Sequence, residues 1–482
     1  MTTFRQLLDQ FDRSAATLPA KGRRFERFCR EYFRSDPLWS DRFDEVWEWS
    51  DWPGRDNAPD TGVDLVARER GTGDLVAIQC KFYSPTASLD WRQVSTFAGM
   101  MGYPDFASGM IVSTAGRESA NVHRNLDKVE KDVSIWRVDD FEESRVDWDH
   151  YELTDSAAEL PFREGKSLRP HQAEAIADVV QGFATADRGQ MIMACGTGKT
   201  FTSLRLAEQA VGVGGTVLFL VPSINLLSQS VQAWAADASV PLATFAVCSD
   251  AQAGRKADED MSANDLAIPA STDVESLIRS FEARASRDRM SVVFSTYQSI
   301  DVITEAQAEG LARFDLIVCD EAHRTTGAIA AVEKQSAFTK VHFNENVDGV
   351  RRLYMTATPR IYGDQAKAKA ADRDVLVASM DDPSTFGEVF HELSFGDAVA
   401  QKLLSDYKVL VLAVNEGEVA ASFQRQLASG GNELGLNDVA RLVGVWHALS
   451  KRGPQFGDDA APMRRAVSFT NTIESSKQIT EL

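Results

Sequence analysis

The stretch that decides the fold is Met193-Ala194-Cys195-Gly196-Thr197-Gly198-Lys199-Thr200, which ends the apolar run Gln190–Met193 and continues beyond it. A glycine-rich turn between a strand and a helix lets backbone N–H groups surround phosphate oxygens, and the helix dipole adds to this attraction. In such a turn Lys199 reaches the outer phosphates and the Thr200 hydroxyl ligates Mg²⁺. The strict pattern has glycine where Met193 stands, so this is a relaxed phosphate-binding loop. The predicted nucleotide-binding residues are Gly196, Thr197, Gly198, Lys199 and Thr200.

A pair of carboxylates further along the chain supports a nucleotide site. Asp320 and Glu321 follow the apolar run Phe314–Cys319. They therefore stand at the carboxyl end of a predicted parallel strand, where open α/β sheets bind their ligands. Asp320 suits the Mg²⁺ shell, and Glu321 suits a base that polarises the attacking water. An isolated Asp-Glu pair is usually a solvated surface turn, but the strand before it and the loop upstream favour the catalytic interpretation.

Short β-rich runs alternate with helical segments from Ser167 onward, which predicts an α/β domain with a parallel sheet and crossover helices. The polar stretch Ala251–Asp273 is predicted to be a surface insertion. The predicted strands are Gln190–Ala194, Thr216–Val221, Thr244–Cys248, Ser291–Ser295, Leu316–Cys319, Arg352–Met355, Tyr407–Val414 and Arg465–Phe469.

Several ordered blocks over about residues 167–482 resemble the motifs of superfamily 2 helicases and translocases. Besides the phosphate-binding loop and Asp320-Glu321-Ala322-His323, they are Arg169-Pro170-His171-Gln172, Val221-Pro222-Ser223, Ser271-Thr272-Asp273, Ser295-Thr296-Tyr297-Gln298, Thr356-Ala357-Thr358-Pro359 and Asn471-Thr472. The resemblance implies two RecA-like lobes. It implies that Gln172 contacts adenine and that His323 is a coupling residue. It implies that three blocks hold DNA phosphates through backbone amides and small hydroxyls, namely Val221-Pro222-Ser223, Ser271-Thr272-Asp273 and Ser295-Thr296-Tyr297-Gln298. It also implies that Thr356-Ala357-Thr358-Pro359 couples hydrolysis to DNA contact and that Asn471-Thr472 is the first motif of the second lobe. His171 is given no catalytic role.

The second lobe of that family supplies arginine fingers, whose blocks lie well after the position of Asn471, whereas this sequence ends at Leu482. We therefore expect a complete first lobe over residues 167–400 and an incomplete second lobe over residues 401–482. The isolated chain is expected to bind ATP weakly and to hydrolyse it poorly.

Residues 1–148 are predicted to form a separate α/β domain, joined to the first lobe by a polar linker over residues 149–166. Its predicted strands are Val63–Ala67, Leu75–Gln79, Gly109–Ser113 and Val133–Val138. The first two are joined by a short Gly-rich turn and predict a β-hairpin.

The hairpin carries three residues suited to phosphodiester hydrolysis. Asp64 lies on one strand, and Gln79 and Lys81 lie two residues apart on one face of the other. This chemistry needs a carboxylate that holds Mg²⁺ and a nearby lysine that stabilises charge or orients water. By spacing alone, a surface ion pair is the commoner explanation of an Asp and a Lys on neighbouring strands.

A helix before the hairpin adds a second carboxylate. Its apolar stripe and its basic stripe lie on opposite faces at helical spacing. The first consists of Phe25, Phe28, Cys29, Tyr32 and Phe33, and the second of Arg23, Arg27, Arg30 and Arg34. Glu26 falls between them, so it can reach a metal beside bound phosphate. The alternative, which is left open, is that Glu26 only pairs with Arg30 at i+4.

Residues Arg23–Phe141 resemble the Mrr-type branch of the PD-(D/E)xK nucleases. The specific part is Gly62-Val63-Asp64 followed by Gln79-Cys80-Lys81. The resemblance implies that Asp64 is the principal metal ligand, that Gln79 replaces the usual second acid and that Lys81 is catalytic. Asp60 is a less favoured candidate.

An Mrr-type nuclease ahead of a superfamily 2 motor resembles the Type ISP restriction-modification enzymes. The resemblance implies ATP- and Mg²⁺-dependent restriction of foreign double-stranded DNA in phage defence. It also implies covalent continuity with coupler, adenine methyltransferase and target-recognition domains; no Asn-Pro-Pro-Tyr-like block is found here. Two alternatives stay open. One is a stand-alone nuclease–helicase fusion in defence or repair, and the other is a DNA translocase module with a degenerate, non-cutting nuclease fold.

The composition excludes collagen-like, mucin-like and wholly disordered proteins. Hydrophobic residues make up 44% and charged residues 25% of the chain, as in globular proteins. No apolar run approaches the roughly 18 residues of a membrane span, and the five cysteines form no Cys-x-x-Cys pair, so we expect a cytoplasmic protein. Cys80, Cys195 and Cys319 are expected to be packing residues. The net charge of −20 argues against a protein that coats nucleic acid, but a DNA enzyme with one basic channel remains possible.

Overall fold

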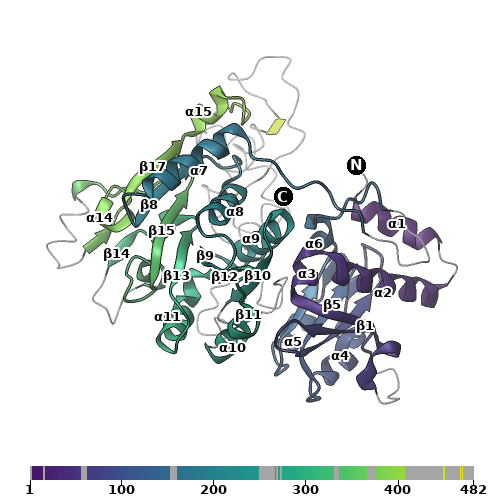
Figure 1. Cartoon of the computed structure of the whole chain (residues 1–482). Coiled ribbons are helices and arrows are strands. Elements are labelled where there is room, and N and C mark those ends of the chain that lie inside the picture. The colour runs from purple at the N-terminus through teal and green to yellow at the C-terminus, as the bar shows by residue number, and fades with distance from the viewer. Residues whose placement is uncertain are drawn as a thin grey trace, which may run out of the picture. The chain divides into compact units, whose positions relative to one another are not determined.

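The structure is a computed structural model that describes residues 3–14, 17–55, 62–151, 160–248, 266, 270–271, 274–329, 336–365, 376–407, 449–450, 467 and 469. It shows an N-terminal domain and a second domain (Figure 1). Both lie in one compact unit, Met1–Ala251 together with Met261–Leu404. Asp60, most of the predicted surface insertion and almost all of the predicted second lobe, including Asn471-Thr472, lie outside the described residues.

The N-terminal domain is a five-stranded mixed sheet in the order β1-β2-β3-β5-β7. Strands β1, β2 and β3 are antiparallel neighbours, whereas β5 and β7 continue the sheet in parallel. The strands are β1 (Phe43–Glu48), β2 (Leu65–Glu69), β3 (Leu75–Lys81), β5 (Phe106–Ser113) and β7 (Val133–Trp136), and β4 (Ser88–Leu89) pairs with β6 (Arg117–Glu118). The helices are α1 (Phe4–Ser14), α2 (Leu18–Ser35), α3 (Pro37–Arg42), α4 (Trp91–Met100), α5 (Ala120–Leu126) and α6 (Val138–Glu143).

Alternating side chains of this sheet face two separate cores. Val76, Ile78 and Cys80 of β3 pack in the core that contains α2, while Ala77 packs with α4 on the other face. The predicted apolar stripe of α2 is buried along its length, with at most 4% of any of its five side chains exposed. The sheet is therefore covered on both faces, and its strand ends are where polar side chains can gather.

The junction between α2 and α3 contains a buried acid. Asp36 is 4% exposed, and its carboxylate accepts a hydrogen bond from the N–H of Leu38 at 3.0 Å, which caps α3. Burial raises the pKa of Asp36 to about 7. The folded chain thus holds this proton more tightly than the unfolded chain does.

Replacing Asp36 by asparagine is expected to flatten the pH dependence of stability. In the natural chain, stability should fall as the pH rises from about 4 to about 7 and then level off, by on the order of 1 kcal/mol per pH unit. Asn removes this titration and still caps a helix well. Thermal unfolding between pH 4 and pH 8 measures the slope, with Asp44→Asn, an exposed acid of the same domain, as the control. An unchanged slope in Asp36→Asn would contradict the assignment.

The second domain is an eight-stranded, wholly parallel sheet in the order β11-β10-β12-β9-β13-β15-β8-β17. The strands are β8 (Arg188–Met193), β9 (Thr216–Val221), β10 (Leu242–Val247), β11 (Ala270–Ser271), β12 (Met290–Thr296), β13 (Phe314–Cys319), β15 (Gly349–Thr356) and β17 (Glu388–Leu393), and β14 (Gly327–Ile329) pairs with β16 (Leu376–Ala378). The longer helices are α7 (Pro170–Gly182), α8 (Lys199–Ala210), α9 (Ile224–Asp237), α10 (Val274–Arg284) and α11 (Ile300–Ala308). This is the α/β architecture predicted for a first RecA-like lobe.

No helix in the described ranges is both long and apolar enough to cross a membrane. Among the cysteines, Cys80 and Cys319 are buried as predicted, but Cys195 is exposed. The prediction for Cys195 was wrong because the residue stands in the loop after β8, where the sheet core has ended.

Candidate functional site

The predicted catalytic hairpin is formed by β2 and β3. The pairing of Leu65 with Ile78 places Asp64, the residue before β2, opposite Gln79. The backbone N–H of Asp64 donates to the carbonyl oxygen of Ile78 at 2.9 Å. Its Oδ2 accepts the N–H of Cys80 at 2.7 Å. The Asp64 carboxylate is therefore held against the strand that carries Gln79 and Lys81.

Gln79 is buried, and only one of its two polar side-chain atoms has a hydrogen-bond partner among the described residues. It is 2% exposed, and its Nε2 donates to the carbonyl oxygen of Gly62 at 2.7 Å. Its Oε1 has no hydrogen-bond partner among the described residues. Gly62 has φ of 84°, a conformation that side chains rarely adopt, and a Cβ added there would lie 3.3 Å from Gln79 Nε2. The amide is thus oriented by the turn, and its buried oxygen fits a metal ligand.

Lys81 is the last residue of β3 and is half-buried. Its backbone is fixed by β5, since it is paired with Ser113 and its carbonyl oxygen accepts the N–H of Thr114 at 3.1 Å. Because side chains alternate along a strand, Lys81 and Gln79 lie on the same face. The hairpin thus places Asp64, Gln79 and Lys81 at one end, and their catalytic roles stay a prediction.

Glu26 approaches the same end of the sheet from α2. Burial raises the pKa of the Cys29 and Cys80 thiols, and the carboxylates of Glu26 and Asp64 both raise it further. Both acids therefore lie near this pair of thiols. Arg30, the alternative partner of Glu26, forms ion pairs with Glu31 at 2.8 Å and with Glu48 at 2.7 Å. A role for Glu26 at the metal stays a prediction.

No group of three His, Cys, Asp or Glu side chains that could hold a metal is found within the described part of the chain. A metal here would therefore rest on two acids, Asp64 and Glu26, and on the amide oxygen of Gln79. This donor set is all oxygen, which suits Mg²⁺.

The phosphate-binding loop joins β8 to α8. Gly196 and Gly198 have φ of 82° and 90°, so both need the freedom of glycine. Thr197 closes the loop by donating its hydroxyl to the carbonyl oxygen of Ala194 at 2.7 Å. Lys199 Nζ donates to the carbonyl oxygen of Met193 at 3.3 Å. Thr200 stands in the first turn of α8, where the helix N-terminus attracts phosphate.

Two side chains of α7 contact a backbone carbonyl oxygen of this loop. His171 Nε2 lies 3.0 Å from the carbonyl oxygen of Thr197, and Gln172 Nε2 donates to the same oxygen at 3.2 Å. Gln172 Oε1 accepts the N–H of Arg169 at 3.0 Å. The adenine contact of Gln172 stays a prediction. The contact of His171 with the loop was not predicted, because its partner lies on a different element.

Asp320 follows β13, which is separated by β15 from β8, the strand before the phosphate-binding loop. It is 7% exposed, and burial raises its pKa to about 6 with a further contribution from Glu321, while Lys199 acts in the opposite direction. The influence of Lys199 places the lysine and the acid in one electrostatic environment. A buried carboxylate that is costly to ionise alone is well matched to a divalent cation.

Hydrogen bonds link this acid pair to two of the other blocks. His323 Nδ1 lies 3.0 Å from Thr356 Oγ1 and 3.3 Å from Glu321 Oε2, and burial lowers the pKa of His323. Tyr297 donates its hydroxyl to the carbonyl oxygen of Asp320 at 2.8 Å. The ends of β12, β13 and β15 are therefore joined through side chains, as a coupling role requires.

Comparisons with known proteins find relatives of both domains. Residues 34–158 match the Mrr_cat_2 restriction endonuclease family, and residues 165–361 match the ResIII family, described as the Type III restriction enzyme res subunit. The solved structure of the ATP-dependent Type ISP restriction-modification enzyme LlaBIII bound to DNA is 39% identical, with a TM-score of 0.83. That similarity covers 100% of this chain and 31% of LlaBIII, so this chain spans about a third of that enzyme's length.

A nuclease-deletion mutant of the Type ISP enzyme LlaGI, in complex with a DNA substrate mimic, is also 39% identical. This similarity covers 65% of this chain and 21% of the LlaGI chain, with a TM-score of 0.46. No curated protein sequence matches the chain.

Proposed function

Because this chain belongs to the restriction enzymes that join an endonuclease domain to a helicase-type ATPase domain, and matches a Type ISP enzyme along its whole length, we propose that it cuts foreign double-stranded DNA at the expense of ATP. The observation that carries the proposal is the whole-length similarity to LlaBIII at 39% identity. The alternative of a non-cutting nuclease fold is less favoured, since Asp64, Gln79 and Lys81 converge at one end of the hairpin and Gln79 keeps an unpartnered buried oxygen.

In the proposed nuclease site, Asp64 and Gln79 would hold Mg²⁺, with Glu26 as a further candidate ligand. When bound, the ion would polarise the scissile phosphate and lower the pKa of a water molecule. Because Nε2 of Gln79 is hydrogen-bonded to Gly62, its Oε1 would be available to hold the ion. Lys81 would stabilise the negative charge that develops on phosphate oxygens.

In the proposed motor site, the N–H groups of Gly196 to Thr200 would bind the phosphates of ATP, and Lys199 would contact the outer ones. Thr200 and Asp320 would hold Mg²⁺, which shields the phosphate charge. Glu321 would accept a proton from the attacking water. Through His323 and Thr356, movement of the acid pair on hydrolysis would reach the Thr356–Pro359 block.

The wider setting of the activity is part of the proposal. The structure of LlaBIII was solved bound to DNA, which supports DNA as the partner of this chain. The Type ISP similarity favours translocation along the duplex and phage defence in the cytoplasm. It also favours continuity with coupler, methyltransferase and target-recognition domains.

The test is cleavage of unmethylated supercoiled plasmid by the complete gene product. We expect loss of the supercoiled form only when ATP and Mg²⁺ are both present, measured by gel electrophoresis over time. EDTA and a non-hydrolysable ATP analogue serve as controls. Cleavage that is equally fast without ATP would contradict coupling, and no cleavage of any unmethylated DNA would contradict the nuclease assignment.

A further inference from the structure

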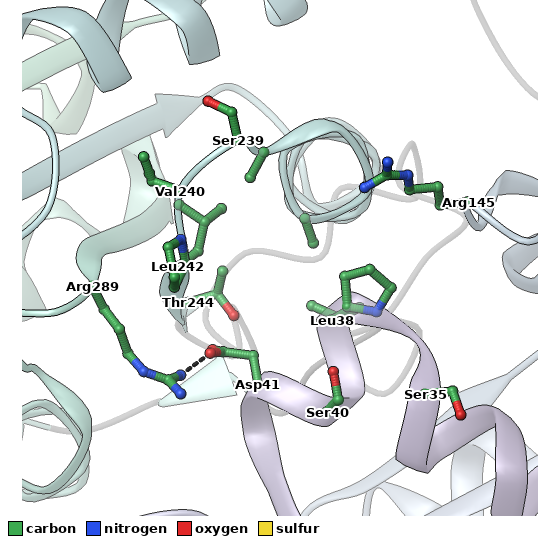
Figure 2. A pocket seen from close by; sticks show the side chains of 14 residues that line it. Ser35, Leu38, Ser40, Asp41, Arg145, Ser239, Val240, Leu242, Thr244 and Arg289 are labelled. Atoms are coloured by element: carbon green, nitrogen blue, oxygen red, sulfur yellow. Dashed lines mark ion pairs between the residues drawn. The ribbon is translucent and has the colours of Figure 1, made fainter. Parts of the chain in front are cut away.

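The N-terminal domain and the first motor lobe meet at what we call the docking surface. On one side are α3 and the turn between β2 and β3, and on the other are α9, β10 and α10. Figure 2 shows α3 facing Leu242 and Thr244 of β10 across a cavity of about 420 Å³. Because this surface is not completely packed, polar contacts must contribute to holding the domains together.

Asp41 of α3 is the acid at the centre of the docking surface. It forms an ion pair with Arg289 of the motor lobe, drawn as a dashed line in Figure 2. Asp41 Oδ2 also lies 3.7 Å from Arg284 Nη2. The side chains of Asp41, Arg284 and Arg289 are 15%, 8% and 24% exposed, so all three charges are largely removed from water.

Arg284 is a largely buried cation of the docking surface. Its Nη1 donates to the carbonyl oxygen of Thr244 at 3.1 Å and its guanidinium lies 5.0 Å from the ring centre of Phe245. Burial lowers its pKa to about 10, Arg42 lowers it further, and Glu69 opposes the change. An arginine that loses its acid in such surroundings is strongly destabilising, because a buried charge is then left uncompensated.

The turn of the catalytic hairpin touches the motor directly. A Cβ added at Gly71 would lie 2.3 Å from the carbonyl oxygen of Ala283 at the end of α10, so only glycine fits this approach. Asp74, in the same turn, lies 3.7 Å from Arg279 of α10. The other end of this hairpin carries Asp64 and Lys81.

On the motor side, α10 is connected to the nucleotide site through β12. Helix α10 is followed by β12, and Arg289 immediately precedes that strand. The residue after β12 is Tyr297, whose hydroxyl donates to the carbonyl oxygen of Asp320. The Asp74–Arg279 ion pair, the chain from α10 to Tyr297 and the Tyr297 hydrogen bond therefore connect the turn of the nuclease hairpin to the acid pair of the motor.

We propose that Asp41 is a positioning residue which docks the nuclease domain on the first motor lobe through Arg284 and Arg289, and that this docking is required for ATP-dependent cleavage. The coupling half of the inference rests on the proposed function. The docking half concerns two domains of this chain and can be measured without DNA.

The test compares five forms of the complete gene product: wild type, Asp41→Ala, Arg289→Ala, the charge swap Asp41→Arg with Arg289→Asp, and Asp44→Ala. Asp44 is the matched control, since it lies close to Asp41 in the sequence, in β1, but pairs with Arg68 of its own domain at 2.8 Å. Hydrogen exchange of the β2–β3 turn and α3 reports docking. ATP hydrolysis and plasmid cleavage report the motor and the nuclease.

We expect Asp41→Ala and Arg289→Ala to speed exchange of the turn and α3 by about tenfold or more. ATP hydrolysis should stay within about twofold, while ATP-dependent cleavage falls by about tenfold. The charge swap should recover part of both losses, and Asp44→Ala should change neither. Cleavage that falls together with docking and returns with the swap is not expected from a merely local packing defect.

Three results would overturn the proposal. Unchanged exchange in Asp41→Ala would show that Asp41 does not dock the domains. Faster exchange with full cleavage would show that docking is not needed for cutting. Loss in both single variants without any recovery in the swap would show that the pair is not the cause. If the wild type cuts no DNA, the proposed function fails, and the exchange data still decide whether Asp41 docks the domains.

Discussion

Replacing Lys81 by alanine is expected to lower Mg²⁺-dependent DNA cleavage by about a hundredfold or more and to leave ATP hydrolysis within about twofold of wild type. The reason is that Lys81 supplies the positive charge at the end of β3, beside Gln79 and Asp64, where the phosphate would react. Its removal touches no part of the motor lobe. Plasmid cleavage and phosphate release, measured on the same preparation, separate the two effects.

Lys128→Ala is the matched control for this prediction, because Lys128 is an exposed lysine of the same domain. It should cut DNA as wild type does. A further pair of variants tests the metal assignment: Gln79→Ala should be as damaging as Lys81→Ala, whereas Gln79→Glu restores an oxygen ligand and should retain part of the activity. Full cleavage in Lys81→Ala would mean that the hairpin is not the cutting site.

Replacing Lys199 by alanine is expected to lower ATP hydrolysis by about a hundredfold or more and to abolish ATP-dependent cleavage with it. Lys199 is the charged side chain of the phosphate-binding loop and shares an environment with Asp320. Without it, the loop still has its backbone N–H groups but loses the charge that stabilises the leaving phosphate oxygens. Phosphate release in the presence of duplex DNA is the measurement.

Lys166→Ala is the control, because that lysine is largely exposed and pairs with Asp237 at 2.7 Å, away from the loop residues. Its ATP hydrolysis should be unchanged. Glu321→Gln gives an independent comparison: it should bind nucleotide but fail to hydrolyse it, since the amide cannot accept a proton. Wild-type hydrolysis by Lys199→Ala would remove the motor site from the proposal.

The central strands of both sheets could be predicted from the sequence because they are continuous apolar runs bounded by turns. Thr216–Val221 agrees with β9 at both ends. Three strands of the two large sheets were not predicted, namely β1, β11 and β17, and all three lie at sheet edges. In β1 and β17, exposed positions take charged residues such as Asp44 and Glu388, so the apolar pattern is lost. The predicted strand Val133–Val138 was too long, because Val138 is apolar yet begins α6.

The candidate sites could be predicted where their residues are close in sequence. Gln79 and Lys81 are two residues apart, and the phosphate-binding loop is continuous. The contact of His171 with Thr197 and that of Tyr297 with Asp320 could not be predicted, since each joins different elements through side chains that have no distinctive spacing. The role of Glu26 stayed ambiguous for the same reason.

The position of β8 in its sheet has a consequence for biosynthesis. Its neighbours β15 and β17 begin at Gly349 and Glu388, far downstream of the strand that ends at Met193. At a ribosomal speed of about 5–20 residues per second, the second neighbour emerges about 10–40 seconds after β8 has been made. Until β15 is made, the apolar strand before the phosphate-binding loop has no partner on either side, and until β17 is made it lacks a partner on one side. A nascent chain of this protein should therefore be a substrate for chaperones until Leu393 has left the exit tunnel.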